Sequence, residues 1–397
     1  MKVAGIIAEF NPFHNGHKLL VQKAREAGYT HVVAVMSGNF VQRGEPAIFH
    51  HSVRTKAALE NGVDLVIQLP SVYAMSGAQS FARAGAEILN GLGIVDSLVF
   101  GSECGDVGLL SETADTVYGD DIKTYLSEEI DKGISFAAAR ENALRKINPA
   151  FADVIKSPNN ILGVEYIAAL KRLGSGITPV TFERIGAAHD SDETDGNIAG
   201  ASMIRELIKN GGDWKKLVPE SAVEIYGCSD IADMSRLENA VLYKIRTVTA
   251  DELAKSPDIS EGIENRILSA AKQSGSLEEL YSIAKTKRYS HARIRRIVWN
   301  CLLGVTSDDL NKSVPYIRIT GFNKRGAELI KATKETAFIP VISKPADLSS
   351  LDETAQRVFS LECTAGDIYS LCYKNPTGCG TEKSLRPVIS DLVYISN

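Results

Sequence analysis

The sequence predicts an α/β protein, with a Rossmann-like N-terminal domain on a parallel sheet and a mainly helical, mixed C-terminal region. Short apolar runs rich in branched side chains lie at positions 3–8, 31–36, 63–69 and 98–100. Helical patterns lie between them, at 17–27, 52–60 and 80–89. Strands that alternate with helices form βαβ units, whose crossovers are right-handed and whose neighbouring strands are parallel.

The early elements end at residues that favour a change of chain direction. Gly28 follows the first helical pattern, at the position where many helices end with a left-handed residue. Asn61 and Gly62 end the second helical pattern, and Pro70 stops the third strand. These signals fix the boundaries of the predicted units.

The middle of the chain changes character twice. Residues 109–173 have a mostly helical pattern, 177–185 return to a strand with β-branched residues, and 186–200 form a loop rich in glycine, alanine and aspartate. A helix at 202–209 then ends in an Asn-Gly-Gly sequence. We place a domain boundary there, which divides the chain into an N-terminal domain, 1–210, and a C-terminal region, 211–397.

The C-terminal region is predicted to be helical at 213–306 and again at 351–373. Between these lies a small strand–helix–strand unit, with its elements at 316–319, 324–333 and 338–341.

Composition restricts the class of protein. The 397 residues carry a formal net charge of −5, so a nucleic-acid surface would have to be local. The six cysteines form no CxxC pair and no zinc-like cluster, which is typical of reduced thiols in a cytoplasmic protein. No apolar run is long enough for a signal peptide or a membrane span. We therefore expect a cytoplasmic protein that does not enter membranes.

The segment Glu9-Phe10-Asn11-Pro12-Phe13-His14-Asn15-Gly16-His17 joins the first strand to the first helix. A helix N-terminus at the carboxyl end of a parallel strand favours phosphate binding. His14 and His17 are three residues apart, so on a helix they share a face and each could donate a ring N–H to phosphate. Gly16 lets a base or ribose approach the backbone. The alternative is an incidental pair of histidines, but the context resembles the HxGH motif of class I nucleotidyltransferases and aminoacyl-tRNA synthetases.

A second motif lies about 190 residues downstream. Residues 199–205 read AGASMIR and resemble the ISSTxIR motif of the same superfamily, in which the serine caps a helix and touches phosphate and the arginine contacts the triphosphate. Only Ser202 and Arg205 match, since Gly200 and Ala201 replace the start of the motif. Without the first motif, the pair would read as an N-cap and a surface charge.

Further segments narrow the resemblance. Residues 9–17, 35–46, 100–103 and 157–163 read EFNPFHNGH, VMSGNFVQRGEP, FGSE and SPNNILG. Together they resemble the bacterial tRNA(Met) cytidine acetate ligases. Members of that family activate acetate with ATP and acetylate the wobble cytidine of elongator tRNA(Met). The resemblance covers the N-terminal half well and is thinner over the C-terminal half. It implies that 1–210 is the ATP-binding catalytic domain and that 211–397 is the RNA-binding region.

The resemblance implies roles for single residues. His14, His17, Ser202 and Arg205 would be catalytic. Residues 7–20 would form the ATP-binding strand and loop, which adds Ile7, Ala8, Glu9, Phe10, Asn11, Pro12, Phe13, Asn15, Gly16, Lys18, Leu19 and Leu20.

Later residues would complete the nucleotide site. Gly101 would admit the adenine or ribose, and either Asn159 or Asn160 would hydrogen-bond the nucleotide. Arg184 and Ile185, at the end of a strand, would contact it as well. Each has a plain alternative: Gly101 as a turn glycine, the two asparagines as part of a helix N-cap, and Arg184 as a surface charge.

Two further regions are candidates for the other substrates. The loop at 37–46 follows a strand, so Gln42 and Arg43 are candidates for contact with acetate or with the tRNA, against the alternative of a solvated turn. A basic segment without acidic residues spans 281–307, and its predicted tRNA-binding side chains are Lys285, Lys287, Arg288, Arg293, Arg295 and Arg296. Lys324 and Arg325 would extend it. The alternative is a merely solvated helix face.

The resemblance implies a reaction in two steps: acetate attacks ATP to give acetyl-adenylate, and the cytidine amine then takes the acetyl group. Mg²⁺ is expected with ATP, although no acidic cluster in the sequence is required to hold it. The alternatives are a small-molecule adenylyltransferase, which would release pyrophosphate without acetate or tRNA, and a non-catalytic RNA-binding protein, which would not bind ATP. The residues alone do not give the oligomeric state.

Overall fold

The structure is a computed structural model that describes residues 1–184, 196–260 and 262–391. Five parallel strands are neighbours in its main sheet, in the order β5-β2-β1-β6-β7, with β7 at the edge. Their bounds are β1 Val3–Ala8, β2 His31–Ser37, β5 Leu65–Leu69, β6 Ser97–Ser102 and β7 Thr178–Glu183. The predicted α/β fold with a parallel sheet is confirmed.

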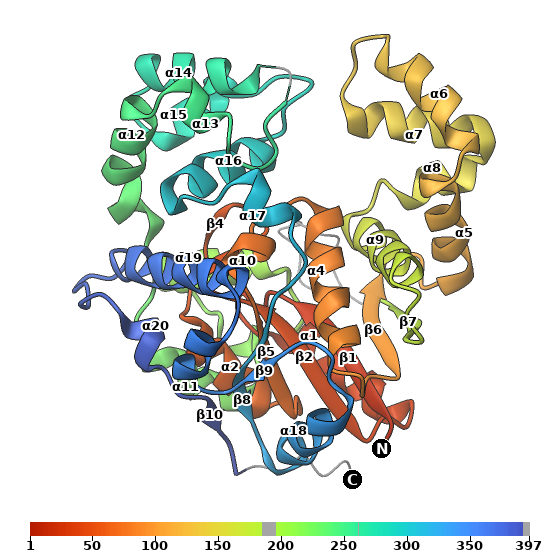
Figure 1. Cartoon of the computed structure of the whole chain (residues 1–397), viewed down its shortest axis with the longest axis vertical. Helices are drawn as coiled ribbons and strands as arrows, with labels where there is room; N and C mark the ends of the chain where they lie inside the picture. Colours follow the sequence, from red (N-terminus) through yellow and green to blue (C-terminus); the bar gives the residue numbers. More distant parts are fainter. Residues whose placement is uncertain (185–195, 261, 392–397) are drawn as a thin grey trace.

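The central strands are buried because helices cover both faces of the sheet (Figure 1). β2 and β5 are buried at every position and β1 is nearly so, which explains their continuous apolar sequences. The helices of this part are α1 Asn15–Glu26, α2 His51–Leu59, α3 Ser71–Ala74, α4 Ala78–Gly91 and α9 Pro158–Arg172. Gly28, just after α1, has a φ of 84°, as its sequence position predicts.

Three short C-terminal strands extend the sheet. β8 Ile317–Phe322 pairs antiparallel with β5, while β9 Val341–Ile342 and β10 Val388–Ile389 pair parallel with β8. The strand predicted at 316–319 is therefore longer in the structure, where it is β8. The strand predicted at 338–341 is replaced by β9, which begins at the last predicted residue. The main sheet also crosses the predicted division at residue 210, so the two regions share one sheet.

Two helical lobes project beyond the same end of the sheet (Figure 1). One lies between β6 and β7 in the chain and consists of α5 Val107–Tyr118, α6 Asp121–Ile130, α7 Phe136–Ile147 and α8 Pro149–Val154. The other consists of α12 Glu238–Thr247, α13 Ala250–Leu253, α14 Ile263–Gln273, α15 Leu277–Ala284, α16 His291–Leu303 and α17 Ser307–Asn311.

The remaining helices pack around the sheet. They are α10 Ala201–Asn210, α11 Glu220–Gly227, α18 Lys324–Thr336, α19 Glu353–Ser370 and α20 Thr381–Ser384. Within the described ranges, none of the helices has the length and hydropathy that crossing a bilayer would require.

Candidate active site

A cavity of about 610 Å³ lies at the carboxyl end of the parallel strands. The ends of β1 and β6 form its floor, and the first turns of α1, α4, α9 and α10 contribute to its walls. Arg296 and Ala292 of α16 complete it. A pocket of about 70 Å³ adjoins it, and His14, His17 and Arg184 line both. This is the edge of a parallel sheet where ligands commonly bind.

His14 and His17 are brought together by the start of α1. His14 is the N-cap, and its Nδ1 accepts the Gly16 N–H at 3.1 Å. His17 reaches back, and its Nδ1 accepts the His14 N–H at 3.2 Å. The rings stack with their centroids 3.7 Å apart. A reciprocal capping box therefore sets the pair, in place of the shared helical face that the spacing predicts.

This geometry fixes the protonation of both rings. Because each Nδ1 accepts a backbone N–H, each neutral ring carries its proton on Nε2 and can donate it to a ligand. Burial, to which the charges of Arg184 and Arg205 add, lowers the pKa of His14 to about 3. Burial also lowers the pKa of His17, with His14 and Arg184 adding to the effect. The pair therefore offers two neutral donors near neutral pH.

Gly16 leaves space for the His14 ring. This role is more direct than the close approach of a nucleotide that the sequence predicts for it. A Cβ at Gly16 would lie 2.9 Å from His14 Cε1 and 3.1 Å from His14 Nδ1. Those distances leave no room for a side chain beside the ring.

The predicted ATP-binding residues at 7–20 fall into two groups, those that line a pocket and those that do not. The residues that line the two pockets are Ile7, Ala8, Glu9, Phe10, Asn11, Gly16, Leu19 and Leu20, together with both histidines. Pro12, Phe13, Asn15 and Lys18 are not among the lining residues. The Phe13 N–H bonds Tyr226 Oη at 2.9 Å, and Asn15 Nδ2 bonds the Lys216 carbonyl at 2.9 Å, so both contacts support the loop.

Arg54 holds the loops around the site together, a role that the sequence does not reveal. Its fully buried guanidinium donates to the carbonyls of Glu9, Gly38 and Phe49, which belong to three separate loops. Burial lowers the pKa of Arg54, and Tyr369 and Glu9 are among the groups that raise it. An arginine on an otherwise ordinary helical pattern gives no sign of this role.

The loop at 37–46 enters the cavity as a hairpin of β3 Phe40–Val41 and β4 Glu45–Pro46. Gly44 has a φ of 74°, the left-handed residue that a three-residue hairpin turn needs. Gln42 and Arg43 line the cavity, and the Gln42 N–H bonds Glu9 Oε1 at 2.8 Å. The prediction that this loop lines the cleft is confirmed.

Glu9 is the acidic residue of the large cavity's described lining. Burial raises its pKa, whereas the bond from Gln42 and the charges of Arg205 and Arg43 lower it. Its carboxylate is thus held among cations at the end of β1.

Ser202 and Arg205 meet, as their spacing predicts. Arg205 Nη2 donates to Ser202 Oγ at 3.3 Å, and its Nη1 donates to the Asn11 carbonyl at 3.0 Å. Glu45 Oε1 lies 3.4 Å from Arg205 Nη2. The expectation that Ser202 caps the helix is wrong, because Gly200 is the N-cap and Ser202 lies one residue inside the helix. Arg205 lines the cavity and Ser202 lies behind it.

The structure separates Asn159 from Asn160. Asn159 lines the cavity, whereas Asn160 is buried and its Oδ1 accepts the N–H groups of Glu103 and Cys104 at 2.9 and 3.1 Å. Glu103 in turn accepts the backbone N–H of Asn159 and Asn160 at 3.3 and 2.8 Å. The side-chain Nδ2 of Asn159 also donates to Glu103 Oε1, at 2.6 Å. Asn159 is therefore the member of the pair that lies on the cavity lining, with its amide hydrogen bonded to Glu103.

Gly101 and Arg184 also lie at the pocket. Gly101 belongs to β6 and is not a turn glycine; a Cβ there would lie 3.0 Å from Arg184 Cγ. Arg184 lines both pockets and donates to Asn159 Oδ1 at 3.4 Å. Ile185 falls outside the described residues.

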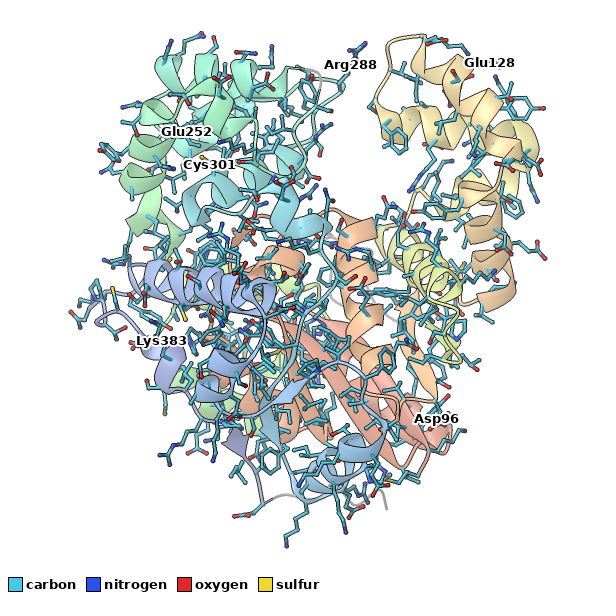
Figure 2. All side chains as sticks on the ribbon, in the orientation of Figure 1. Asp96, Glu128, Glu252, Arg288, Cys301 and Lys383 are labelled. Atoms are coloured by element: carbon cyan, nitrogen blue, oxygen red, sulfur yellow. The ribbon has the colours of Figure 1, made fainter. Side chains whose placement is uncertain are left out.

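The residues of the basic segment differ in their exposure and in whether they line the cavity. Lys285, Lys287 and Arg288 are exposed, and Arg288 extends from its lobe toward the α6–α7 lobe, where its Nε bonds the Gly133 carbonyl at 3.3 Å (Figure 2). Arg293 and Arg295 are half-buried and are not among the residues that line the cavity, whereas Arg296 lines it.

The expected extension of the basic segment by Lys324 and Arg325 is wrong. These residues begin α18, which lies at the opposite end of the molecule from α16 (Figure 1). The two basic patches are separated by the sheet.

His50, His51 and Glu382 bring potential metal-ligating atoms within 4.8 Å of one another. However, His50 Nδ1 accepts the Ser52 N–H at 3.2 Å, so its Nε2 carries the proton on the side that faces Glu382. Arg318 Nη1 lies 2.7 Å from the same carboxylate. The cluster is therefore a buried hydrogen-bond network that joins α20 to the sheet.

Comparisons with known proteins agree with this geometry. The family model described as "HIGH Nucleotidyl Transferase" matches residues 1–383. A tRNA(Met) cytidine acetate ligase of Acetivibrio thermocellus is 41% identical, over 95% of this chain and 96% of that protein. A protein of the same name from Thermoanaerobacter sp. is 39% identical, over 98% and 100%.

Two crystal structures of Thermotoga maritima TmcAL are also similar. The apo form I has a TM-score of 0.93 at 31% identity and covers 99% of this chain and 100% of that one. Form II, described as bound with alpha-thio ATP, has a TM-score of 0.91 at the same identity and coverage.

Proposed function

The chain belongs to the HIGH nucleotidyl transferase family and, within it, to the tRNA(Met) cytidine acetate ligases, and from this premise we propose how its cavity works. The enzyme uses ATP to convert acetate to acetyl-adenylate. It then transfers the acetyl group to N4 of the wobble cytidine of elongator tRNA(Met). The observation that carries this proposal is the stacked pair of His14 and His17, whose Nδ1 atoms accept backbone N–H groups, in one cavity with Arg205.

In the first step, a carboxylate oxygen of acetate attacks the α-phosphorus of ATP, and the bond to the β-phosphate oxygen breaks, which releases pyrophosphate. Negative charge grows on the leaving phosphates. His14, His17 and Arg205 line this cavity, and their N–H groups would donate hydrogen bonds to phosphate oxygens. Preorganised donors of this kind account for much of the acceleration in phosphoryl-type transfers.

In the second step, the cytidine amine attacks the acetyl carbonyl, and the bond between the acetyl carbon and AMP breaks. The amine loses a proton. Glu9 is the carboxylate on the described cavity lining, so we assign it as the acceptor of that proton. Gln42 and Arg43 lie on the same wall and remain the candidates for contact with acetate.

Mg²⁺ belongs to this proposal as an ion that accompanies ATP. It would supply charge neutralisation to the triphosphate. Among the described residues, the cavity lining holds one carboxylate beside several arginines, so the chain offers no acidic cage and the ion would depend on the phosphates. The location that fits these substrates is the cytoplasm.

The exchange of labelled pyrophosphate into ATP tests the first step without tRNA. We expect exchange that requires acetate and is reduced about 10²–10³-fold in His17→Ala, because a positioned transition-state donor is lost. Exchange without acetate would contradict the acetate assignment. Undiminished exchange in His17→Ala would contradict the site.

A further inference from the structure

We propose that Arg296 binds a phosphate of the RNA strand where that strand enters the cavity. Arg296 is contributed by α16, the helix of the C-terminal lobe that reaches the active site. The inference rests on the proposed function for the identity of the RNA. The anion-binding role itself rests on the geometry of the arginine.

The guanidinium of Arg296 is only partly used by the protein. Its Nε lies 2.8 Å from Asp258 Oδ2, and no other described residue pairs with its two Nη groups. The side chain is 14% exposed and lines the cavity. An arginine that is fixed at Nε and open at Nη presents a planar fork, the geometry that phosphate oxygens accept in pairs.

The neighbouring arginines of α16 are used differently. Arg293 gives its Nε to the Asp258 carbonyl at 2.9 Å and its Nη2 to Ser260 Oγ at 2.6 Å. Arg295 lies 3.7 Å from Glu278 and 5.4 Å from the centre of the Tyr281 ring. Neither lines the cavity. Arg296 is therefore the one of the three whose charge faces the substrates.

Asp258 positions Arg296. Asp258 has a φ of 65°, a conformation that costs an aspartate conformational energy. In this conformation its backbone carbonyl accepts a hydrogen bond from Arg293, and its carboxylate accepts one from Arg296. The carboxylate holds the fork in place and offsets part of the cost of burying its charge.

Contact between α16 and the hairpin places Arg296 beside the reacting groups. A Cβ at Gly44 would lie 2.6 Å from the Arg296 backbone nitrogen, so the turn that carries Gln42 and Arg43 packs directly on this helix. The small pocket with His14 and His17 does not include α16. Arg296 thus lies outside the small pocket, although both histidines also line the large cavity with it, and it follows the exposed Lys285–Arg288 segment in the chain. That position favours RNA over ATP as the source of the phosphate.

The test compares full-length Arg296→Ala and Arg296→Lys with Arg246→Ala as the control. Arg246 belongs to α12 of the same lobe, donates to the carbonyls of Ala271 and Ser274, and does not line the cavity. Binding of a tRNA(Met) transcript is titrated at several salt concentrations. Acetate-dependent pyrophosphate exchange is measured without RNA.

We expect Arg296→Ala to weaken RNA binding about 10-fold or more and to reduce the slope of log affinity against log salt by about 0.7–0.9, with the KM for ATP within about twofold of wild type. Arg296→Lys should restore the salt slope but only part of the affinity, because the charge returns without the fork. Arg246→Ala should match the wild type in both RNA binding and the KM for ATP.

Three results would overturn the inference. A raised KM for ATP with unchanged RNA binding would assign Arg296 to the triphosphate. Equal losses in Arg246→Ala would mean that the stability of the lobe is being measured. Unchanged binding in all three variants would remove the site. If the wild type binds RNA but shows no acetate-dependent exchange, the proposed function fails while the salt titration still decides the role of Arg296.

Discussion

Replacing Gly16 with alanine should separate catalysis from stability. The new Cβ would lie 2.9 Å from His14 Cε1, whereas ordinary contact begins at 3.4 Å, so the ring must move by about half an ångström. The stacked His17 ring, with its centroid 3.7 Å away, restricts that movement. Displacement of a positioned catalytic group by up to about 1 Å costs about 10²-fold in rate. We therefore expect pyrophosphate exchange to fall about 10- to 100-fold.

Stability should hardly change. Alanine is favoured over glycine in a helix by up to about 1 kcal/mol, and a disturbed N-cap costs about the same. The two contributions nearly cancel, so the free energy of unfolding in urea should stay within about 1 kcal/mol of wild type.

Gly227→Ala is the control, because Gly227 ends α11 and a Cβ there would meet nothing within 4 Å. That variant should keep wild-type exchange. Wild-type exchange in Gly16→Ala would refute the argument that the ring position matters. A loss of several kcal/mol in Gly16→Ala would show instead that the loop had unfolded.

Three further predictions concern buried ionisable side chains. Arg54→Met should lower the free energy of unfolding by about 3–5 kcal/mol in urea titrations, because three loop carbonyls lose a buried donor; a loss below about 1 kcal/mol would contradict its assigned role. Because the pKa of His14 is lowered to about 3, nitrogen NMR should find its ring neutral with the proton on Nε2 at pH 5.5, and a midpoint near 6.5 would disprove the geometry. Glu362 is a buried residue of α19 whose carboxylate accepts the Ser71 N–H at 2.6 Å. Burial and then Glu382 raise its pKa to about 7, so the native state holds the extra proton. Stability should therefore fall as pH rises from about 4.5 to 7, by at most about 3 kcal/mol. Glu362→Gln should flatten that decline, and an unchanged pH dependence of unfolding would rule it out.

The parallel sheet and the histidine motif could be predicted because their signals are local. An apolar run such as β1 must be a buried strand, and Gly28 and Pro70 end elements through their own backbone preferences. The motif around His14 lies on a strand end and a helix start, so its position in the fold follows from the order of elements.

The features that the sequence did not predict depend on contacts between residues far apart in the chain. β8 pairs with β5 across about 250 residues, which no local pattern records. Glu103 caps α9 from another loop, and Asp258 and Ser260 engage the arginines of α16, so a face that looks merely basic in sequence is half-buried. The role of Arg296 appears only when α16 is seen against the cavity.

The central claim is that this cavity joins acetate to tRNA through an adenylate. Its most direct test is incubation of the protein with labelled acetate, ATP, Mg²⁺ and elongator tRNA(Met), followed by digestion and mass analysis of the nucleosides. We predict labelled N4-acetylcytidine from the wobble position with the wild type, and none above background with His14→Ala or His17→Ala. Label that does not enter RNA with the wild type, or that enters equally with the histidine variants, would contradict the account.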